Sequence, residues 1–222
     1  QPGGLFLSQI EAVIFDMDGV IVDSEPYHDQ SFLEIWQEMG YGDCHGIHLP
    51  DFYGRSDRVL WEAFIEKHHP PQPIEQLIGL REQRLIQLLR NKRPIFDGVP
   101  ELVQRLANRF PLAVGSGSAH RIIDEVLAMR DLRRYFLHTV SSEDVVQPKP
   151  APDIFLLVAK CLGVDPANCC VIEDTFCGIQ AANAAGMTVL AITNTFGAKE
   201  LGQAGASQVF NEYVTIGDAL LN

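Results

Sequence analysis

Charged and hydroxyl side chains with the types needed for phosphate chemistry stand directly after short apolar runs of this sequence, or just before a helical pattern. They are Asp16-Met17-Asp18-Gly19, Gly115-Ser116-Gly117-Ser118, Lys149 in a proline-rich segment, and Glu173-Asp174. Carboxylates bind Mg²⁺, and a lysine or the amides at the start of a helix bind phosphate oxygens. Together these groups favour phosphoryl transfer, in which positioning and charge stabilisation dominate catalysis.

The carboxylates need a positive charge if they converge. Two carboxylates ~4 Å apart repel by about 4 kcal/mol at an effective dielectric of ~20, so Asp16, Asp18 and Asp174 would not all ionise unaided. Mg²⁺ is commonly held by one or two carboxylates plus a substrate phosphate, and Lys149 adds a fixed cation. We expect Ser116 and the amides of Gly117 and Ser118 to open a helix and bind phosphate oxygens.

The two aspartates near the N-terminus can divide the chemical work. Asp16 would attack phosphorus and become an aspartyl phosphate, while Asp18 would protonate the leaving alcohol and later accept a proton from water. Acid and base assistance of this kind is worth about 10²–10⁴-fold. An aspartate before glycine is also a common turn former, so Asp18-Gly19 alone does not establish the role.

Short β-branched runs alternate with helical patterns over most of the chain. The runs at 11–15, 112–114, 170–172 and 188–192 predict buried strands, and the intervening segments repeat apolar residues at helical spacing. Strands separated by helices form a parallel sheet covered on both faces, so the fold class is α/β. In such sheets, ligands bind beyond the carboxyl ends of the strands, where the polar groups stand.

The stretch 25–94 contains only helical patterns and follows the first strand. It predicts a small helical cap domain (25–94) inserted into a core domain formed by 1–24 and 95–222.

Composition excludes several classes of protein. The 222 residues are 46% hydrophobic and carry a formal net charge of −12, so nucleic acid and anionic membranes are not expected partners. No apolar run reaches the length of a membrane span and no signal peptide is recognised, so we expect a cytoplasmic protein. The oligomeric state is open, and a monomer is compatible with the sequence.

The five cysteines are odd in number and lack a CxxC pair, so we expect them to be reduced and mostly buried. Cys44, His45 and His48 resemble a fragment of a metal site, but without a second pair of ligands a packing role is favoured.

Four segments, taken in order, resemble the motifs of the haloacid dehalogenase (HAD) superfamily, in particular its β-phosphoglucomutase-like and sugar-phosphate phosphatase branch. They are residues 16–24, Ser116, residues 149–155 and residues 171–175. The resemblance implies a Rossmann-like core, Mg²⁺ and phosphorylation of Asp16. It also implies metal ligation by the Asp16 side chain, the Asp18 main-chain oxygen and Asp174, with Glu173 adjacent or linked through water. The second aspartate, Asp18, favours phosphoryl chemistry over dehalogenation.

The cap would select the substrate. By resemblance, Glu25 and His28 lie where the chain enters the cap, and Gly54 and Arg55 belong to a loop that reaches the site. The guanidinium of Arg55 makes it the best candidate to bind a remote anionic or sugar group, and the alternative interpretation is a solvated arginine before a helix. His28 is equally compatible with an ordinary hydrogen-bonded histidine of a cap helix.

The sequence therefore predicts a Mg²⁺-dependent phosphatase that hydrolyses small phosphorylated sugars or related metabolites. The alternative is a β-phosphoglucomutase, in which a Lys-Asn pair helps to hold the second phosphate. Ala119 and His120 stand at those positions here, which weakens the alternative. A phospho-acceptor signalling module combines similar groups, but the helical insert and Asp18 argue against it.

Overall fold

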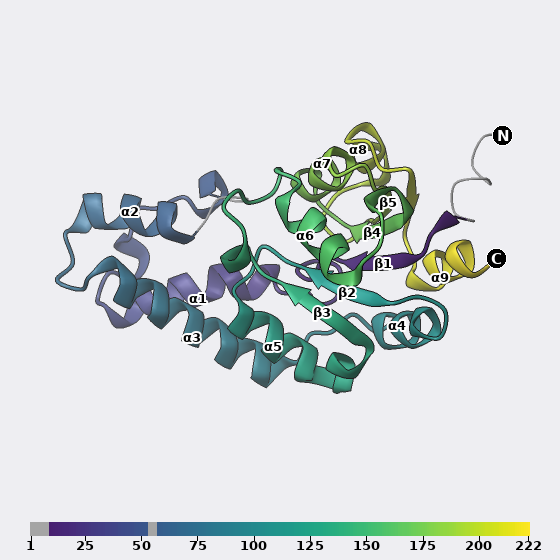
Figure 1. Ribbon diagram of the computed structural model, residues 1–222. Helices are drawn as coiled ribbons and strands as arrows, with labels where there is room; N and C mark the ends of the chain where they lie inside the picture. Colours follow the sequence, from purple (N-terminus) through teal and green to yellow (C-terminus); the bar gives the residue numbers. More distant parts are fainter. Residues whose placement is uncertain (1–8, 53–56) are drawn as a thin grey trace. The chain divides into compact units, whose positions relative to one another are not determined.

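The computed structural model describes residues 9–52 and 57–222. The chain divides into two compact units, and Figure 1 colours both by position in the sequence. The core unit contains residues up to 23 and from 94 to 222, and the helical unit contains residues from 24 to 93.

A six-stranded sheet forms the centre of the core unit, and all its neighbouring strands are parallel. Its strands, in chain order, are β1 (Ala12–Phe15), β2 (Leu112–Gly115), β3 (Phe136–Val140), β4 (Cys169–Glu173), β5 (Thr188–Ile192) and β6 (Gln208–Phe210). The spatial order is β3-β2-β1-β4-β5-β6. The direction of strand addition therefore reverses between β1 and β4, which is the place where ligands bind in open sheets of this kind.

Helices cover both faces of the sheet (Figure 1). Those of the core unit are α4 (Val99–Ala107), α5 (His120–Ala128), α6 (Asp153–Leu162), α7 (Phe176–Ala184), α8 (Ala198–Gln203) and α9 (Tyr213–Leu221). One buried cluster joins sheet residues such as Ile14 and Val171 to Phe155 of α6 and Ile179 of α7. Because β1 and β4 are buried on both faces, their sequences are continuously apolar rather than alternating.

The predicted α/β class with a Rossmann-like parallel sheet is confirmed, and the predicted strands coincide with β1, β2, β4 and β5. Strands β3 and β6 were not predicted. Both lie at the edges of the sheet. Edge strands have less to bury, and three of the five residues of β3 are not buried, so neither carries a continuous apolar run.

The helical unit contains α1 (Glu25–Glu38), α2 (Asp57–His68) and α3 (Ile74–Lys92). Short 3₁₀ helices complete the structure at Gly42–Cys44, Leu49–Phe52, Met129–Tyr135, Ser142–Asp144 and Pro166–Asn168. Aromatic side chains fill the core of this unit, with Trp36 stacked on Phe64 at a ring-centroid distance of 5.3 Å. The ring of His45 also stacks on Trp36, at a ring-centroid distance of 4.4 Å. His45 therefore has the packing contact that was expected of it.

The cysteines differ in part from expectation. All five are free, but Cys44, Cys161 and Cys177 are exposed, and only Cys169 and Cys170 are buried. The expectation that most are buried was wrong because the two exposed helical cysteines lie on faces turned away from the core. Every helix among the described residues is too short or too polar to cross a membrane.

Candidate active site

Asp16, Lys149 and Glu173 meet at the carboxyl ends of β1 and β4. Phe15 pairs with Ile172, and the Asp16 N–H donates to the Ile172 carbonyl at 3.0 Å, so the two strands deliver Asp16 and Glu173 side by side. The Lys149 ammonium lies between them, 2.7 Å from Asp16 Oδ1 and 2.9 Å from Glu173 Oε1. All three side chains are largely shielded from solvent.

Glu173 is held in place by its own strand-to-helix turn. Its Oε2 accepts hydrogen bonds from the Asp174 N–H at 2.7 Å, the Thr175 N–H at 2.8 Å and the Thr175 hydroxyl at 3.0 Å. Gly178 makes room for it, because a Cβ there would lie 1.5 Å from Glu173 Oε1. These three donors bind Oε2 and Lys149 binds Oε1, so both oxygens of Glu173 accept hydrogen bonds.

Asp174 follows β4 and turns toward the loop after β1. Its Oδ2 accepts a hydrogen bond from the hydroxyl of Thr195, which follows β5. Gly19 lies so close that a Cβ on it would be 2.0 Å from Asp174 Oδ2, and its φ of +79° also favours glycine. Asp174 Oδ1 is buried and has no hydrogen-bond partner among the described residues.

Burial shapes the titration of this cluster. It raises the pKa of Asp16 from 3.8 to about 7, with the positive charge of Lys149 opposing the shift and Glu173 adding to it. Burial likewise raises the pKa of Asp174 to about 9, with repulsion from Glu173 and Asp16 as further causes. Burial alone would lower the pKa of Lys149, but the charges of Asp16 and Glu173 outweigh it, so the pKa rises.

The residues fit a divalent cation. Asp16, Glu173 and Asp174 present carboxylate oxygens within 4.8 Å of one another, and they form the one such acidic group in the described part of the chain. A buried carboxylate oxygen without a donor, on a group whose ionisation is opposed by burial and like charge, is a ligand atom ready for a metal ion. Oxygen-only ligands suit Mg²⁺ or Ca²⁺ rather than a softer metal.

Asp18 points toward the end of β2 instead of into this acidic group. Its Oδ2 accepts hydrogen bonds from the Ser118 hydroxyl at 2.7 Å and from the Ser116 hydroxyl at 3.4 Å. Ser116, directly after β2, is buried, and its N–H donates to Val140 at 3.0 Å. The site residues that were predicted for the core domain therefore lie together at one end of the sheet.

The predicted phosphate-binding helix start was wrong in one respect. Helix α5 begins at His120, after Ser116, Gly117 and Ser118 rather than within them. The Ser118 N–H donates to Ser116 Oγ at 3.0 Å, so it is not available to bind a phosphate oxygen as predicted. A Cβ on Gly117 would meet nothing within 4 Å, so space lies open beside that residue.

Three residues of the site were not predicted. Thr195 contacts Asp174, and Asn194 and Tyr213 contact the backbone of the loop after Asp18. The positions of Asn194 and Thr195 directly after the predicted strand 188–192 were a usable signal, because polar residues there lie at the ligand-binding edge. No sequence pattern marks Tyr213.

Comparisons with known proteins identify the family of this chain. The family model of the haloacid dehalogenase-like hydrolases matches residues 10–186. The chain belongs to this family. Hexitol phosphatase B of Escherichia coli (strain K12) is 37% identical over 191 residues, covering 83% of this chain and 84% of that protein. Fructose-1-phosphate phosphatase YqaB of the same strain is 36% identical over 179 residues, covering 79% and 92%.

Solved structures agree with the assignment of this HAD hydrolase. A haloacid dehalogenase-like protein of Agrobacterium tumefaciens has a TM-score of 0.71 and 30% identity over 96% of this chain and 98% of its own. A β-phosphoglucomutase of Clostridium difficile has a TM-score of 0.76 over 96% and 97% of the two chains, and its 24% identity shows the fold alone. The predicted family and the predicted class of enzyme, a HAD phosphatase, are confirmed.

The cap residues predicted for this HAD hydrolase are only partly described. Gly54 and Arg55 lie outside the described residues. Glu25 is exposed at the first residue of α1, and His28 lies one turn later. His28 Nδ1 pairs with the guanidinium of Arg81, a buried residue of α3 that also binds Asp57 at 2.7 Å.

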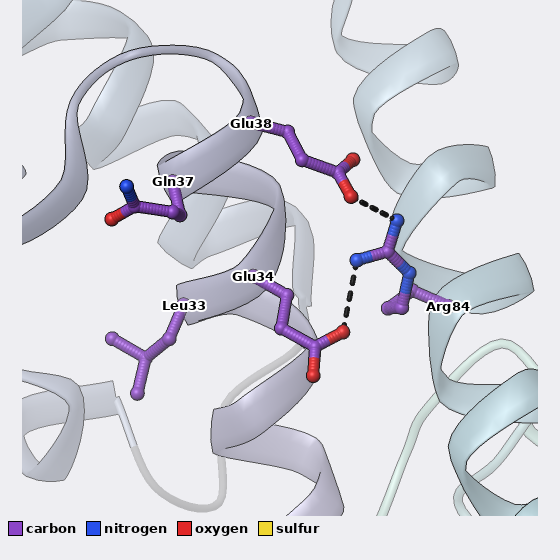
Figure 2. A pocket seen from close by; sticks show the side chains of 5 residues that line it. All are labelled: Leu33, Glu34, Gln37, Glu38 and Arg84. Carbon is purple, nitrogen blue, oxygen red and sulfur yellow. Dashed lines mark hydrogen bonds and ion pairs between the residues drawn. The ribbon is translucent and has the colours of Figure 1, made fainter.

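A hollow on the surface of the helical unit is a poor alternative site (Figure 2). It is lined by Leu33, Glu34, Gln37, Glu38 and Arg84. Arg84 bridges the two helices that form it, 2.9 Å from Glu34 and 2.7 Å from Glu38, so its guanidinium is already paired with carboxylates. Among the described residues, the carboxyl end of the parallel sheet brings Asp16 and Lys149 together, with Asp18 nearby.

Proposed function

We propose that this HAD phosphatase hydrolyses phosphate monoesters of small sugars or polyols with Mg²⁺, through an aspartyl phosphate on Asp16. The observation that carries the proposal is the meeting of Asp16, Lys149 and Asp174 at the reversal point of the sheet, with Asp18 beside them. The names of the hexitol and fructose-1-phosphate phosphatases support sugar or polyol substrates.

Asp16 is the proposed nucleophile. One of its oxygens attacks phosphorus while the bond from phosphorus to the substrate alcohol breaks. Lys149, 2.7 Å from Asp16 Oδ1, would favour the ionised form that burial opposes, and would then stabilise charge on the phosphoryl oxygens. Hydroxyl and amide donors of Ser116 and Gly117 are proposed to bind those oxygens from the β2 side.

Asp18 is the proposed acid and base. It gives a proton to the leaving oxygen as the first bond breaks, then takes one from the water that attacks the aspartyl phosphate, and inorganic phosphate leaves. The hydrogen bonds from Ser118 and Ser116 orient the Asp18 carboxyl group. Asp16, Asp174 and the Asp18 main-chain oxygen would hold Mg²⁺. Glu173 would bind Lys149 instead of the ion. The ion, when bound, supplies positive charge opposite the phosphoryl group.

The helical unit is proposed to act as a cap, with Glu25, His28, Gly54 and Arg55 recognising the part of the substrate away from phosphorus. We also propose that residues 1–24 and 95–222 form the core domain and that residues 25–94 form the cap domain. The small phosphorylated metabolite is the one partner proposed, and a cytoplasmic location stays a prediction.

The competing activity is that of a β-phosphoglucomutase, with the same aspartyl phosphate but a sugar hydroxyl as acceptor. At the position of the second-phosphate ligands, His120 Nε2 lies 2.7 Å from Asp144, and the His120 N–H donates to Glu143 at 2.8 Å. Both partners of His120 belong to the core unit, so its ring and its N–H already have partners there. These contacts favour water as the acceptor.

A panel of sugar and polyol phosphates tests the proposal. Each would be incubated with enzyme and Mg²⁺, and free phosphate would be measured in parallel with conversion of β-glucose 1-phosphate into glucose 6-phosphate. We expect repeated turnovers of phosphate release and no isomerisation. Isomerisation without release would establish the mutase, and a single stoichiometric phosphorylation would establish an acceptor module.

A further inference from the structure

We propose that Tyr213 and Asn194 are positioning residues that hold the loop carrying Asp18 and thereby aim its carboxyl group at the leaving oxygen. The inference rests on the proposed function, because it assigns a role in the same reaction. Both side chains bind the main chain of the two residues that follow Asp18, which are Gly19 and Val20.

The hydrogen bonds form a chain with only one possible direction. Asn194 Nδ2 donates to the Gly19 carbonyl at 2.6 Å and to Tyr213 Oη at 2.7 Å, and Tyr213 Oη lies 2.7 Å from the Val20 carbonyl. A carbonyl oxygen can only accept, so the tyrosine proton must go to Val20 and the amide must supply both other protons. Each donor is therefore used, and both carbonyls are fixed.

Tyr213 reaches the loop from the far end of the sequence. It is the first residue of α9 and lies 193 positions from Val20. Its ring packs so closely over Gly98 that a Cβ there would lie 2.8 Å from it, and the ring of Phe96 is 6.0 Å away. Burial raises the pKa of Tyr213, so its hydroxyl remains a donor over the whole working range of pH.

The loop needs this support. Its own hydrogen bonds converge on two carbonyls, with the N–H groups of Val20, Ile21 and Val22 all directed to Met17 and the Gly19 N–H directed to Val22. Those bonds leave the carbonyls of Gly19 and Val20 to Asn194 and Tyr213. Asp18 immediately precedes them, so a rotation of these peptide planes would move its side chain.

The experiment uses the leaving group to separate aiming from general stability. Fructose 1-phosphate releases an alkoxide that needs a proton from Asp18, whereas p-nitrophenolate leaves without one. The ratio kcat/KM covers the steps up to alcohol release, so it reports protonation of the leaving group and not the later attack of water.

For Tyr213→Phe, which keeps the ring, we expect kcat/KM to fall about tenfold for fructose 1-phosphate and less than about twofold for p-nitrophenyl phosphate, a fraction of the full acid effect. Asn194→Ala should give the same selective loss. The double variant should lose no more than the larger single loss, because the two groups form one chain. Tyr135→Phe is the matched control, since that hydroxyl contacts Arg134 on the surface.

Equal losses on both substrates, or no loss in folded Tyr213→Phe and Asn194→Ala proteins, would overturn the aiming role while leaving the phosphatase intact. A wild-type protein that releases phosphate from neither compound would overturn the proposed function as well. Melting temperatures of each variant show whether it is folded.

Discussion

At the scale of single residues, the proposed nucleophile Asp16 is buried beside Lys149. Asp16→Asn removes the attacking oxygen, so we expect phosphate release to fall at least about 10⁴-fold. The melting temperature should stay close to that of the wild type, because burial disfavours the charged carboxylate that the amide replaces and Lys149 keeps Glu173. Phosphate assays and thermal melts on purified protein check both parts.

The control for this substitution is Asp124→Asn, an exposed aspartate on α5 that should lose neither activity nor stability. Asp16→Asn protein that still turned over at a rate near that of the control would remove Asp16 as the nucleophile.

Gly178 illustrates how a residue without a functional group supports the site. In Gly178→Ala, the new methyl group would overlap Glu173 Oε1, so the Glu173 side chain and with it Lys149 must shift. We expect a loss of about 1–3 kcal/mol in unfolding free energy and at least a roughly tenfold loss of kcat. Urea denaturation and phosphate release measure the two effects.

Gly79→Ala is the matched change in α3, where a Cβ meets nothing within 4 Å. It should stabilise the protein by about 0.5–1 kcal/mol, because alanine favours a helix over glycine. Similar behaviour of the two alanine variants would contradict the close packing of Glu173 on α7.

At the scale of elements, the end of α3 stores backbone strain. Arg93 adopts φ 50° and ψ 53° directly after the helix, and its N–H donates to Leu89 at 2.7 Å. Arg93→Gly keeps that bond and relieves the left-handed conformation, so we expect a gain of about 1 kcal/mol in stability. Urea denaturation monitored by circular dichroism measures it.

Glycine in the middle of the same helix serves as the comparison. Gln87→Gly changes an exposed residue of α3 and should cost about 1 kcal/mol. If Arg93→Gly lost as much stability as Gln87→Gly, the left-handed conformation of Arg93 would not be a source of strain.

At the scale of the whole molecule, the proposed Mg²⁺ site would link metal binding to stability. The pKa values of Asp16 and Asp174, about 7 and about 9, lie above the ordinary 3.8, so the metal-free folded state binds more protons than the unfolded state across this range. Their effect is to lower the free energy of unfolding as pH rises from about 4 to 9. Mg²⁺ bound as proposed would replace those protons and should reverse the loss.

We therefore expect the rise in melting temperature caused by Mg²⁺, relative to chelator, to be larger at pH 9 than at pH 6. Calorimetry with Mg²⁺ or EDTA at both pH values measures it, and EDTA should also stop turnover until Mg²⁺ is added back. In Asp174→Asn the Mg²⁺ effect should largely disappear. A Mg²⁺ effect that is independent of pH, or that persists in this variant, would contradict the linkage.

The sequence by itself determined the α/β class and the central strands, and it supplied the candidates for the reacting groups. Strands buried on both faces are continuously apolar, and polar residues that directly follow them stand at the ligand-binding edge, so Asp16, Ser116 and Asp174 were recognisable from type and position. The edge strands β3 and β6 were missed because they bury less.

Only the tertiary structure decided how these groups are held. Glu173 accepts hydrogen bonds from Lys149 and Thr175. The Ser118 N–H donates a hydrogen bond to Ser116 Oγ. Asn194 and Tyr213 meet the loop from 175 and 193 positions away. A lone asparagine or tyrosine has no spacing signature, because a hydrogen bond depends on distance and direction in space, which the chain acquires only when α9 packs beside α4.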